Sequence, residues 1–238
     1  SEINKKGTHF DLAIALQIAL FEEKNIDFED TYFFGELALD GNIKDTSSIF
    51  PIILSLTKKN LINKVLVCEE SAKKLSNIPN LEIYCVKNLD DAINFIKSNK
   101  KEEFLFRKNP LEYKVLKINE IEYYFDTNYI DDFQDVIGQD MAKNAAVISS
   151  AGCHNIIFEG SPGCGKSMIS KRLKYIMPPM NLEEILEKAK LQSLDYKEVD
   201  FLPIRAFRSP HHSSTKSSIF GGGSSNAKMG EIALSNNG

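Results

Sequence analysis

Eight consecutive residues of this chain have the types and the spacing that could cradle phosphate. They follow the pattern G-x-x-x-x-G-K-[ST] and are Gly160, Ser161, Pro162, Gly163, Cys164, Gly165, Lys166 and Ser167. Glycines let the backbone curl, so that successive N–H groups point at phosphate oxygens. We expect the Lys166 ammonium to reach the β- and γ-phosphates and the Ser167 hydroxyl to bind Mg²⁺. The loop therefore predicts ATP and Mg²⁺ as ligands.

The residues on either side of this loop favour the elements that such a loop needs. Residues 154–159, His-Asn-Ile-Ile-Phe-Glu, are predicted to form a short buried strand that enters the loop. Residues 166–177 predict the helix that leaves it, with its positive N-terminal end facing the phosphates. A chance glycine-rich turn is the alternative, and the order of strand, loop and helix argues against it.

Composition excludes several classes of protein. The 238 residues carry a net charge of −4, so any binding of nucleic acid needs a local basic patch. Cys68, Cys85, Cys153 and Cys164 lie far apart, which argues against a zinc site or a disulfide framework and suits a reducing cytosol. No apolar run approaches the roughly 18 residues of a membrane span. We expect a cytoplasmic protein of two domains that does not bind membranes.

Residues 9–97 alternate between helix and strand patterns and predict an α/β layer domain. Helices are expected at residues 11–21, 51–57, 69–75 and 89–96, and strands at residues 31–34, 35–41, 64–68 and 81–86. Asp11 is the expected N-cap of the first helix, and Pro51 opens the second. Residues 98–131 are charged and aromatic, and they form either a connector with some strand character or an edge strand of either domain.

The order of features around the phosphate loop resembles that of the AAA+ ATPases. Val136, Ile137, Gly138 and Gln139 precede a predicted helix over residues 140–150, and the loop follows. In that superfamily a segment similar to Val136–Gln139 lines the adenine pocket. A plain strand-to-helix turn, in which Gly138 takes a positive φ, is the alternative.

Later segments narrow the resemblance to the magnesium-chelatase-related AAA+ proteins, and among these to the YifB/ComM competence family. Residues 205–212, RAFRSPHH, are similar to its R-P-F-R-x-P-H-H. Gly221–Gly223 resemble its G-G-G turn, and residues 230–238, GEIALSNNG, resemble G-E-I-x-L-A-H-N-G. Ala206 and Met229 stand where the family has proline, which alters loop stiffness more than chemistry.

This resemblance implies an ATP-driven ring of identical subunits, expected to be a hexamer, that moves on DNA in natural transformation or recombination. Residues 201–230 contain no acidic residue, and their cations are candidate contacts to DNA phosphates. The candidates are Arg205, Arg208, Lys216 and Lys228. A solvated loop or a subunit contact is the alternative. Because neighbouring side chains on an extended chain point to opposite sides, His211 and His212 do not predict a metal site.

Residues 35–41, GELALDG, resemble the G-E-I-T-L-R-G strand of the Lon proteolytic domain, so residues 1–97 are expected to form a partial Lon-like domain. Lon uses a Ser-Lys pair in which the lysine takes the proton of the serine. Alignment of residues 5–9 with K-D-G-P-S places His9 at the serine, and a similar alignment places Phe50 at the lysine. We expect this domain to be non-catalytic, without peptidase activity.

Hydrolysis of ATP needs an acidic pair at the end of an apolar strand. Residues 168–238 contain no apolar run followed by Asp-Glu, and in the family that strand follows the Asn-Gly matched by Asn237–Gly238. We therefore expect residues 132–238 to be the N-terminal part of a P-loop α/β/α core of the AAA+ type, in a chain whose two ends are both cut. The expected behaviour is binding of ATP without useful hydrolysis.

Two other functions stay open at this point. One is a magnesium-chelatase subunit that drives metal insertion, and the Lon-like block argues against it because such subunits resemble only the second block. The other is a nucleotide-binding scaffold that does not hydrolyse ATP, which applies if the chain ends naturally at Gly238. The residues that follow Gly238 would separate these readings.

Overall fold

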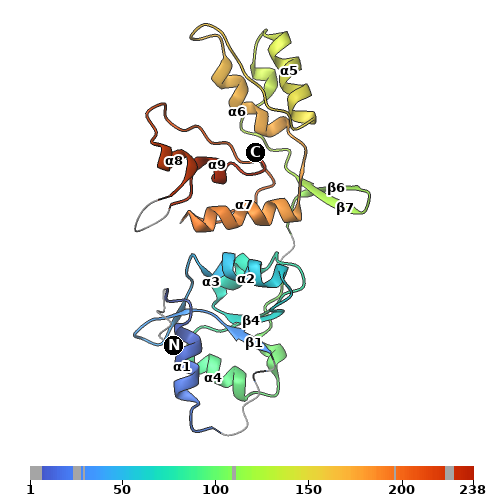
Figure 1. Ribbon diagram of the computed structural model, residues 1–238. Helices are drawn as coiled ribbons and strands as arrows, with labels where there is room; N and C mark the ends of the chain where they lie inside the picture. The colour runs from blue at the N-terminus through green and yellow to red at the C-terminus, as the bar shows by residue number, and fades with distance from the viewer. Residues whose placement is uncertain (1–6, 24–27, 29, 109–110, 196, 223–227) are drawn as a thin grey trace. The chain divides into compact units, whose positions relative to one another are not determined.

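The chain has a mixed α/β fold with a three-stranded parallel sheet, which confirms the predicted fold class at this level. The computed structural model (Figure 1) describes residues 7–23, 28, 30–108, 111–195, 197–222 and 228–238. Two compact units make up the chain. The first comprises residues 1–111 and 192–199, and the second comprises residues 112–191 and 200–238.

The parallel sheet belongs to the first unit and has the strand order β1-β4-β5. Its strands are β1 (Thr31–Phe33), β4 (Lys64–Val67) and β5 (Glu82–Cys85). Val65 of the central strand pairs with Tyr32 on one side and with Ile83 on the other. The side chains of β4 after Lys64 are fully buried apolar groups, as expected for a strand covered on both faces.

Four helices cover this sheet, with α1 and α4 on one face and α2 and α3 on the other (Figure 1). They are α1 (Asp11–Ala19), α2 (Ile49–Lys58), α3 (Glu69–Leu75) and α4 (Leu89–Lys97). Leu12 and Leu16 of α1 pack with Phe95 of α4 in one buried cluster. A short hairpin of β2 (Glu36–Leu37) and β3 (Ile43–Lys44) and a 3-10 turn, η1 (Lys101–Phe104), complete the unit.

Three local predictions in this unit need correction. Phe10, not Asp11, is the N-cap of α1, because the N–H of Asp11 already donates to the carbonyl of Thr8. The strand expected over residues 35–41 is only two residues long, since the chain turns back at Gly41 with a φ of 83°. Helix α2 begins two residues earlier than predicted, and Pro51, its third residue, keeps its predicted place in the first turn.

The two positions aligned with the Lon catalytic pair are both buried in this unit. Phe50 is 2% exposed and His9 is 6% exposed, and the His9 ring lies against Phe10 with the centroids 4.0 Å apart. Residues 5 and 6 of the run aligned with Lon lie outside the described residues. Neither position presents a nucleophile or a lysine to solvent.

The second unit holds an antiparallel sheet and several helices. Strands β6 (Lys114–Ile118), β7 (Ile121–Phe125) and β8 (Met180–Asn181) pair in this order, so the strand character expected within residues 98–131 is confirmed. Asn119 and Glu120 turn the hairpin with φ values of 48° and 66°. The helices of five residues or more are α5 (Asp140–Ala151), α6 (Lys166–Ile176), α7 (Leu182–Leu194) and α8 (Lys216–Phe220). Two shorter turns are η2 (Phe133–Asp135) and α9 (Glu231–Leu234).

The prediction of a strand over residues 154–159 is wrong in this structure. These residues have no regular structure, and Ile157 is 91% exposed. A strand needs a neighbour that completes its ladder of hydrogen bonds, and none of the described strands lies beside this segment. Phe158 nevertheless packs against a buried cluster, which keeps the segment next to α5 and α6. Among the described residues, we find no helix with the length and apolar character of a membrane span.

Candidate nucleotide-binding site

The phosphate loop joins residue 159 to α6 through backbone conformations that favour glycine. Gly163 has a φ of 81° and Gly165 a φ of 90°, and both lie in the left-handed region. A Cβ at either position would meet no atom within 4 Å, so the backbone conformation and not lack of space calls for glycine. Gly165 is the N-cap of α6, which begins at Lys166 as predicted.

The Lys166 ammonium folds back over its own loop. Its Nζ donates to the carbonyl oxygens of Gly160 and Ser161, at 2.8 Å each, and lies 3.5 Å from the Cys164 sulfur. Ser167 is exposed in the first turn of α6, whose first N–H groups have no partner within the helix. Glycine turns, a cation, an exposed hydroxyl and the N-terminal end of a helix together fit a triphosphate with Mg²⁺.

The segment predicted to contact adenine begins with a residue that packs against α6, the helix that follows this loop. Val136 is 4% exposed and packs with Ala146 of α5, Ile169 of α6 and Phe158, which stands two residues before the loop. Ile137 is 95% exposed. The packing of Val136 therefore brings the start of this segment next to Ile169, in the first turn of α6.

Two unusual backbone conformations follow in this segment. Gly138 has a positive φ, 67°, as the alternative of a plain turn assumes, and Gln139 has a φ of 58° that the sequence did not indicate. Lys143 of α5 donates from Nζ to the carbonyl oxygen of Val136 at 3.1 Å. Helix α5 thus holds the buried end of the segment while Ile137 stays exposed.

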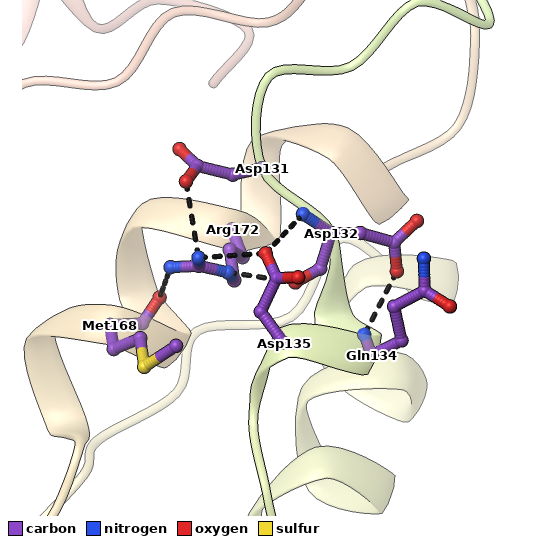
Figure 2. A network of polar contacts seen from close by, with 6 residues as sticks. All are labelled: Asp131, Asp132, Gln134, Asp135, Met168 and Arg172. Atoms are coloured by element: carbon purple, nitrogen blue, oxygen red, sulfur yellow. Dashed lines mark hydrogen bonds and ion pairs between the residues drawn. The ribbon is translucent and has the colours of Figure 1, made fainter.

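A buried arginine that the sequence did not single out ties this segment to α6 (Figure 2). The Arg172 side chain is 11% exposed and contacts three aspartates of the same stretch. Its Nε donates to the carbonyl of Asp132 at 2.8 Å, and one terminal nitrogen lies 3.1 Å from Asp131 and 2.9 Å from Asp135. The only sequence signal for this contact is the three aspartates in residues 131–135, and they do not indicate which cation of α6 pairs with them.

Comparisons with known proteins match both parts of the chain. A family described as magnesium chelatase, subunit ChlI, matches residues 132–238, and one described as subunit ChlI of Mg-chelatase matches residues 1–71. Competence protein ComM of Haemophilus influenzae is 32% identical over 243 residues, which is 100% of this chain and 45% of that protein. The uncharacterized proteins YifB of Salmonella typhimurium and Escherichia coli are each 29% identical over 100% of this chain and 44% of their own length.

The chain belongs to the magnesium chelatase family, with ComM and YifB among its relatives. It spans about 45% of the length of ComM. One expectation needs correction here. Because a ChlI family model matches residues 1–71, the first block does not set the chain apart from chelatase subunits.

In this magnesium chelatase family member, the motif segment at residues 205–212 contacts the one at residues 230–238. Arg208 pairs with Glu231 through two nitrogens, one of them 2.7 Å from Oε1. Gly230 lies so close to Gly221 that a Cβ on it would come within 2.3 Å of the Gly221 nitrogen. Gly223, the last residue of the predicted G-G-G turn, lies outside the described residues.

Arg205 is enclosed by protein groups. It is 8% exposed and donates to the carbonyls of Pro178 and Asn237, at 2.9 and 2.8 Å, and to Glu184 at 3.1 Å. Arg205 and Arg208 therefore both have partners within the chain. Of the four predicted DNA contacts, Lys216 and Lys228 are exposed.

The two adjacent histidines do not point apart, so that detail of the sequence interpretation is wrong. Their ring centroids lie 4.0 Å apart, and His211 Nδ1 is 2.7 Å from the Ser213 hydroxyl. The reason is a turn at residues 212–213, where an extended chain was assumed. Within the described ranges, no group of three or more His, Cys, Asp or Glu side chains could hold a metal ion.

Proposed function

We propose that this chain is the nucleotide-binding part of an AAA+ ATPase and takes Mg²⁺-ATP at residues 160–167. The observation that carries the proposal is the run of left-handed glycine turns that ends at Lys166, on the first turn of the 11-residue helix α6. Backbone N–H groups of the loop would bind the phosphates, and Lys166 would leave its two carbonyl partners for the β- and γ-phosphates. Ser167 would hold Mg²⁺, which neutralises charge on the phosphates.

The base would bind at Val136–Gln139. Val136 is buried against both flanking helices and gives the segment a fixed place beside the loop. Ile137 offers an exposed apolar side chain on which a flat purine can pack. This part of the proposal explains why an exposed isoleucine stands between a buried valine and a left-handed glycine.

Equilibrium binding of ATP by this chain tests the proposal. We expect Mg²⁺-dependent, saturable binding that falls by about tenfold or more in Lys166→Ala, because a charged contact to phosphate is lost. Lys171→Ala is the matched control, since Lys171 is an exposed lysine of the same helix. Equal affinity of the wild type and Lys166→Ala would rule out the loop as the site.

For the whole protein, we propose a ring of identical subunits, of hexameric size, that uses ATP to act on DNA. The name of the relative ComM, a competence protein, supports this. The exposed Lys216 and Lys228 lie in a stretch without acidic residues and suit contacts to phosphates that carry no sequence information.

Anisotropy of labelled duplex and single-stranded DNA, measured at several salt concentrations, tests the DNA proposal. Replacing both Lys216 and Lys228 with alanine should weaken binding to every DNA sequence. The slope of the logarithm of the binding constant against the logarithm of the salt concentration should become shallower by about one to two. Lys171→Ala is again the control. Absence of any DNA binding at low salt would contradict the proposal.

Magnesium insertion is the second candidate, because both matching families are described by a magnesium chelatase subunit. In that reaction the metal is a substrate and not a resident cofactor. Stimulation of the whole protein's ATP turnover by a porphyrin, and not by DNA, would favour this candidate.

A further inference from the structure

Helix α6 has a second attachment point besides the phosphate loop. Lys166 stands at its first residue, and Arg172 stands six residues later. The Arg172 side chain is 11% exposed and leaves α6 toward residues 131–135, as Figure 2 shows. Its remaining terminal nitrogen lies 3.4 Å from the carbonyl of Met168, within the helix itself. One rigid helix therefore carries both the phosphate loop and this contact.

The stretch that Arg172 contacts has a fixed internal geometry. The Asp132 carboxylate accepts from the N–H of Gln134 at 2.9 Å, and the Asp135 carboxylate accepts from the N–H of Asp132 at 3.0 Å. The second bond is one half of a capping box around η2, in which the Asp132 side chain accepts in return from the backbone of Asp135. The N–H of Val136 then donates to the carbonyl of Phe133 at 3.1 Å. Whatever holds η2 therefore also sets the position of Val136.

Electrostatics favour the arginine at this place. A guanidinium presents several donors in one plane and can serve a carbonyl and two carboxylates together, which a lysine ammonium cannot do in the same geometry. The backbone N–H of Asp132, and then Arg172, hold the pKa of Asp135 below its usual range. Lys143 reaches the carbonyl of Val136 from α5 on the other side. Cations from both helices thus hold the two ends of the short stretch from Asp132 to Val136.

We propose that Arg172 is a positioning residue for the nucleotide base. By joining α6 to residues 131–135, it fixes Val136–Gln139 at a set place relative to the phosphate loop, so that triphosphate and base are bound together. This role rests on the proposed function. It predicts that the loss of Arg172 weakens the binding of the base and spares the binding of the phosphates.

A comparison of two ligands tests this role, with ATP and inorganic tripolyphosphate titrated calorimetrically in the presence of Mg²⁺. In Arg172→Gln we expect the dissociation constant for ATP to rise about tenfold, as when a charged positioning contact is removed. The constant for tripolyphosphate should change less than about twofold. Lys171→Gln removes the same charge from the neighbouring exposed residue and should change neither constant.

Conservative variants separate positioning from general damage to the fold. Arg172→Lys keeps the charge but not the planar set of donors, and it should give an intermediate loss of ATP affinity. Asp135→Asn removes one partner from the other side and should shift the ratio of the two constants in the same direction, even if Arg172→Gln does not fold.

Each outcome bears on the proposal. Equal weakening of both ligands, or no weakening of ATP, in the folded variants would overturn the role of Arg172 and leave the phosphate site intact. Binding of tripolyphosphate but not of ATP by the wild type would overturn the base site. A wild type that binds neither ligand would overturn the proposed function and this role together.

Discussion

The ammonium nitrogen of Lys166 lies 2.8 Å from the carbonyl oxygen of Gly160, the first residue of its own loop. The carbonyl of Ser161 lies at the same distance. Among the residues that the structure describes, the lysine is therefore held by neutral acceptors of the loop and not by a carboxylate. Phosphate oxygens carry full charge and form stronger hydrogen bonds with a cation than a carbonyl does. A triphosphate can compete for this lysine without breaking an ion pair.

This competition predicts that Mg²⁺-ATP changes the reactivity of Lys166. Acetylation of the chain by an amine reagent, followed by mass spectrometry, should show slower modification of Lys166 when ATP is present. Lys171, exposed on the same helix, should react at the same rate with or without ATP. Equal rates at Lys166 under both conditions would mean that the phosphates do not contact it.

The second prediction concerns turnover. Residues 168–238 contain no apolar run followed by Asp-Glu, the acidic pair that we expect to orient a water and to make a second metal contact. We expect Mg²⁺-ATP binding without release of phosphate above the uncatalysed rate. A coupled phosphate assay on the wild type and on Lys166→Ala checks this, and turnover that disappears in the variant would show that hydrolysis needs no further residues.

The third prediction concerns the glycine before α6. In Gly165→Ala, a residue with a Cβ must take a φ of 90°, which costs about 1–2 kcal/mol. We expect a lower midpoint of thermal unfolding and weaker ATP binding. Ser161→Ala is the control, because it changes a side chain in the same loop without demanding a left-handed residue. A variant with unchanged stability would mean that the loop can adopt another conformation.

The sequence was sufficient for features that depend on neighbouring residues. The loop pattern predicted the start of α6 at Lys166, and the match for α3 extends over all of Glu69–Leu75. Prediction from the sequence failed where the structure of a segment depends on a distant part of the chain. Residues 154–159 have the composition of a buried strand, yet none of the described strands pairs with them. The sequence of a segment does not reveal whether another strand will supply the hydrogen bonds that make it a β-strand.

In the candidate site too, the sequence predicted the features that depend on neighbouring residues and missed those that depend on distant ones. Types and spacing located the phosphate loop, because the glycines and the lysine act within eight residues. The acid-free stretch around Arg205 predicted a possible DNA contact but gave no sign that the carbonyls of Pro178 and Asn237 accept hydrogen bonds from this arginine. Arg172 went unnoticed for the related reason that its partners lie about 40 residues earlier.

The fourth prediction concerns an ion pair in the first unit. The Asp45 carboxylate is 7% exposed, lies 2.5 Å from Lys74, and also accepts from the Ser71 hydroxyl. In Asp45→Asn we expect a loss of about 1–3 kcal/mol of stability, because a buried charged network loses a partner. Glu70→Gln is the matched control, since Glu70 pairs with the same lysine but is 69% exposed and should matter by less than about 1 kcal/mol. Urea unfolding measures the stability of both variants. Equal losses in Asp45→Asn and Glu70→Gln would contradict the view that the buried pair contributes more than the exposed one.

The last prediction concerns pH and uses Asp135. Its pKa lies below the usual value because of the N–H of Asp132 and, next, the Arg172 guanidinium. A carboxyl with a lower pKa in the folded state adds stability above its unfolded pKa, about 3.9 for Asp. That stability is lost as the pH falls through the folded value.

The wild type should therefore exceed Asp135→Asn in stability by a constant amount between about pH 5 and pH 8, and the two curves should converge below about pH 4. Unfolding by urea at a series of pH values measures this difference. Asp140→Asn is the control, because the Asp140 side chain is 85% exposed and pairs with Lys143 of the next turn. A difference that does not shrink as the pH falls below about 4 would show that the charge of Asp135 is not what holds η2 to Arg172.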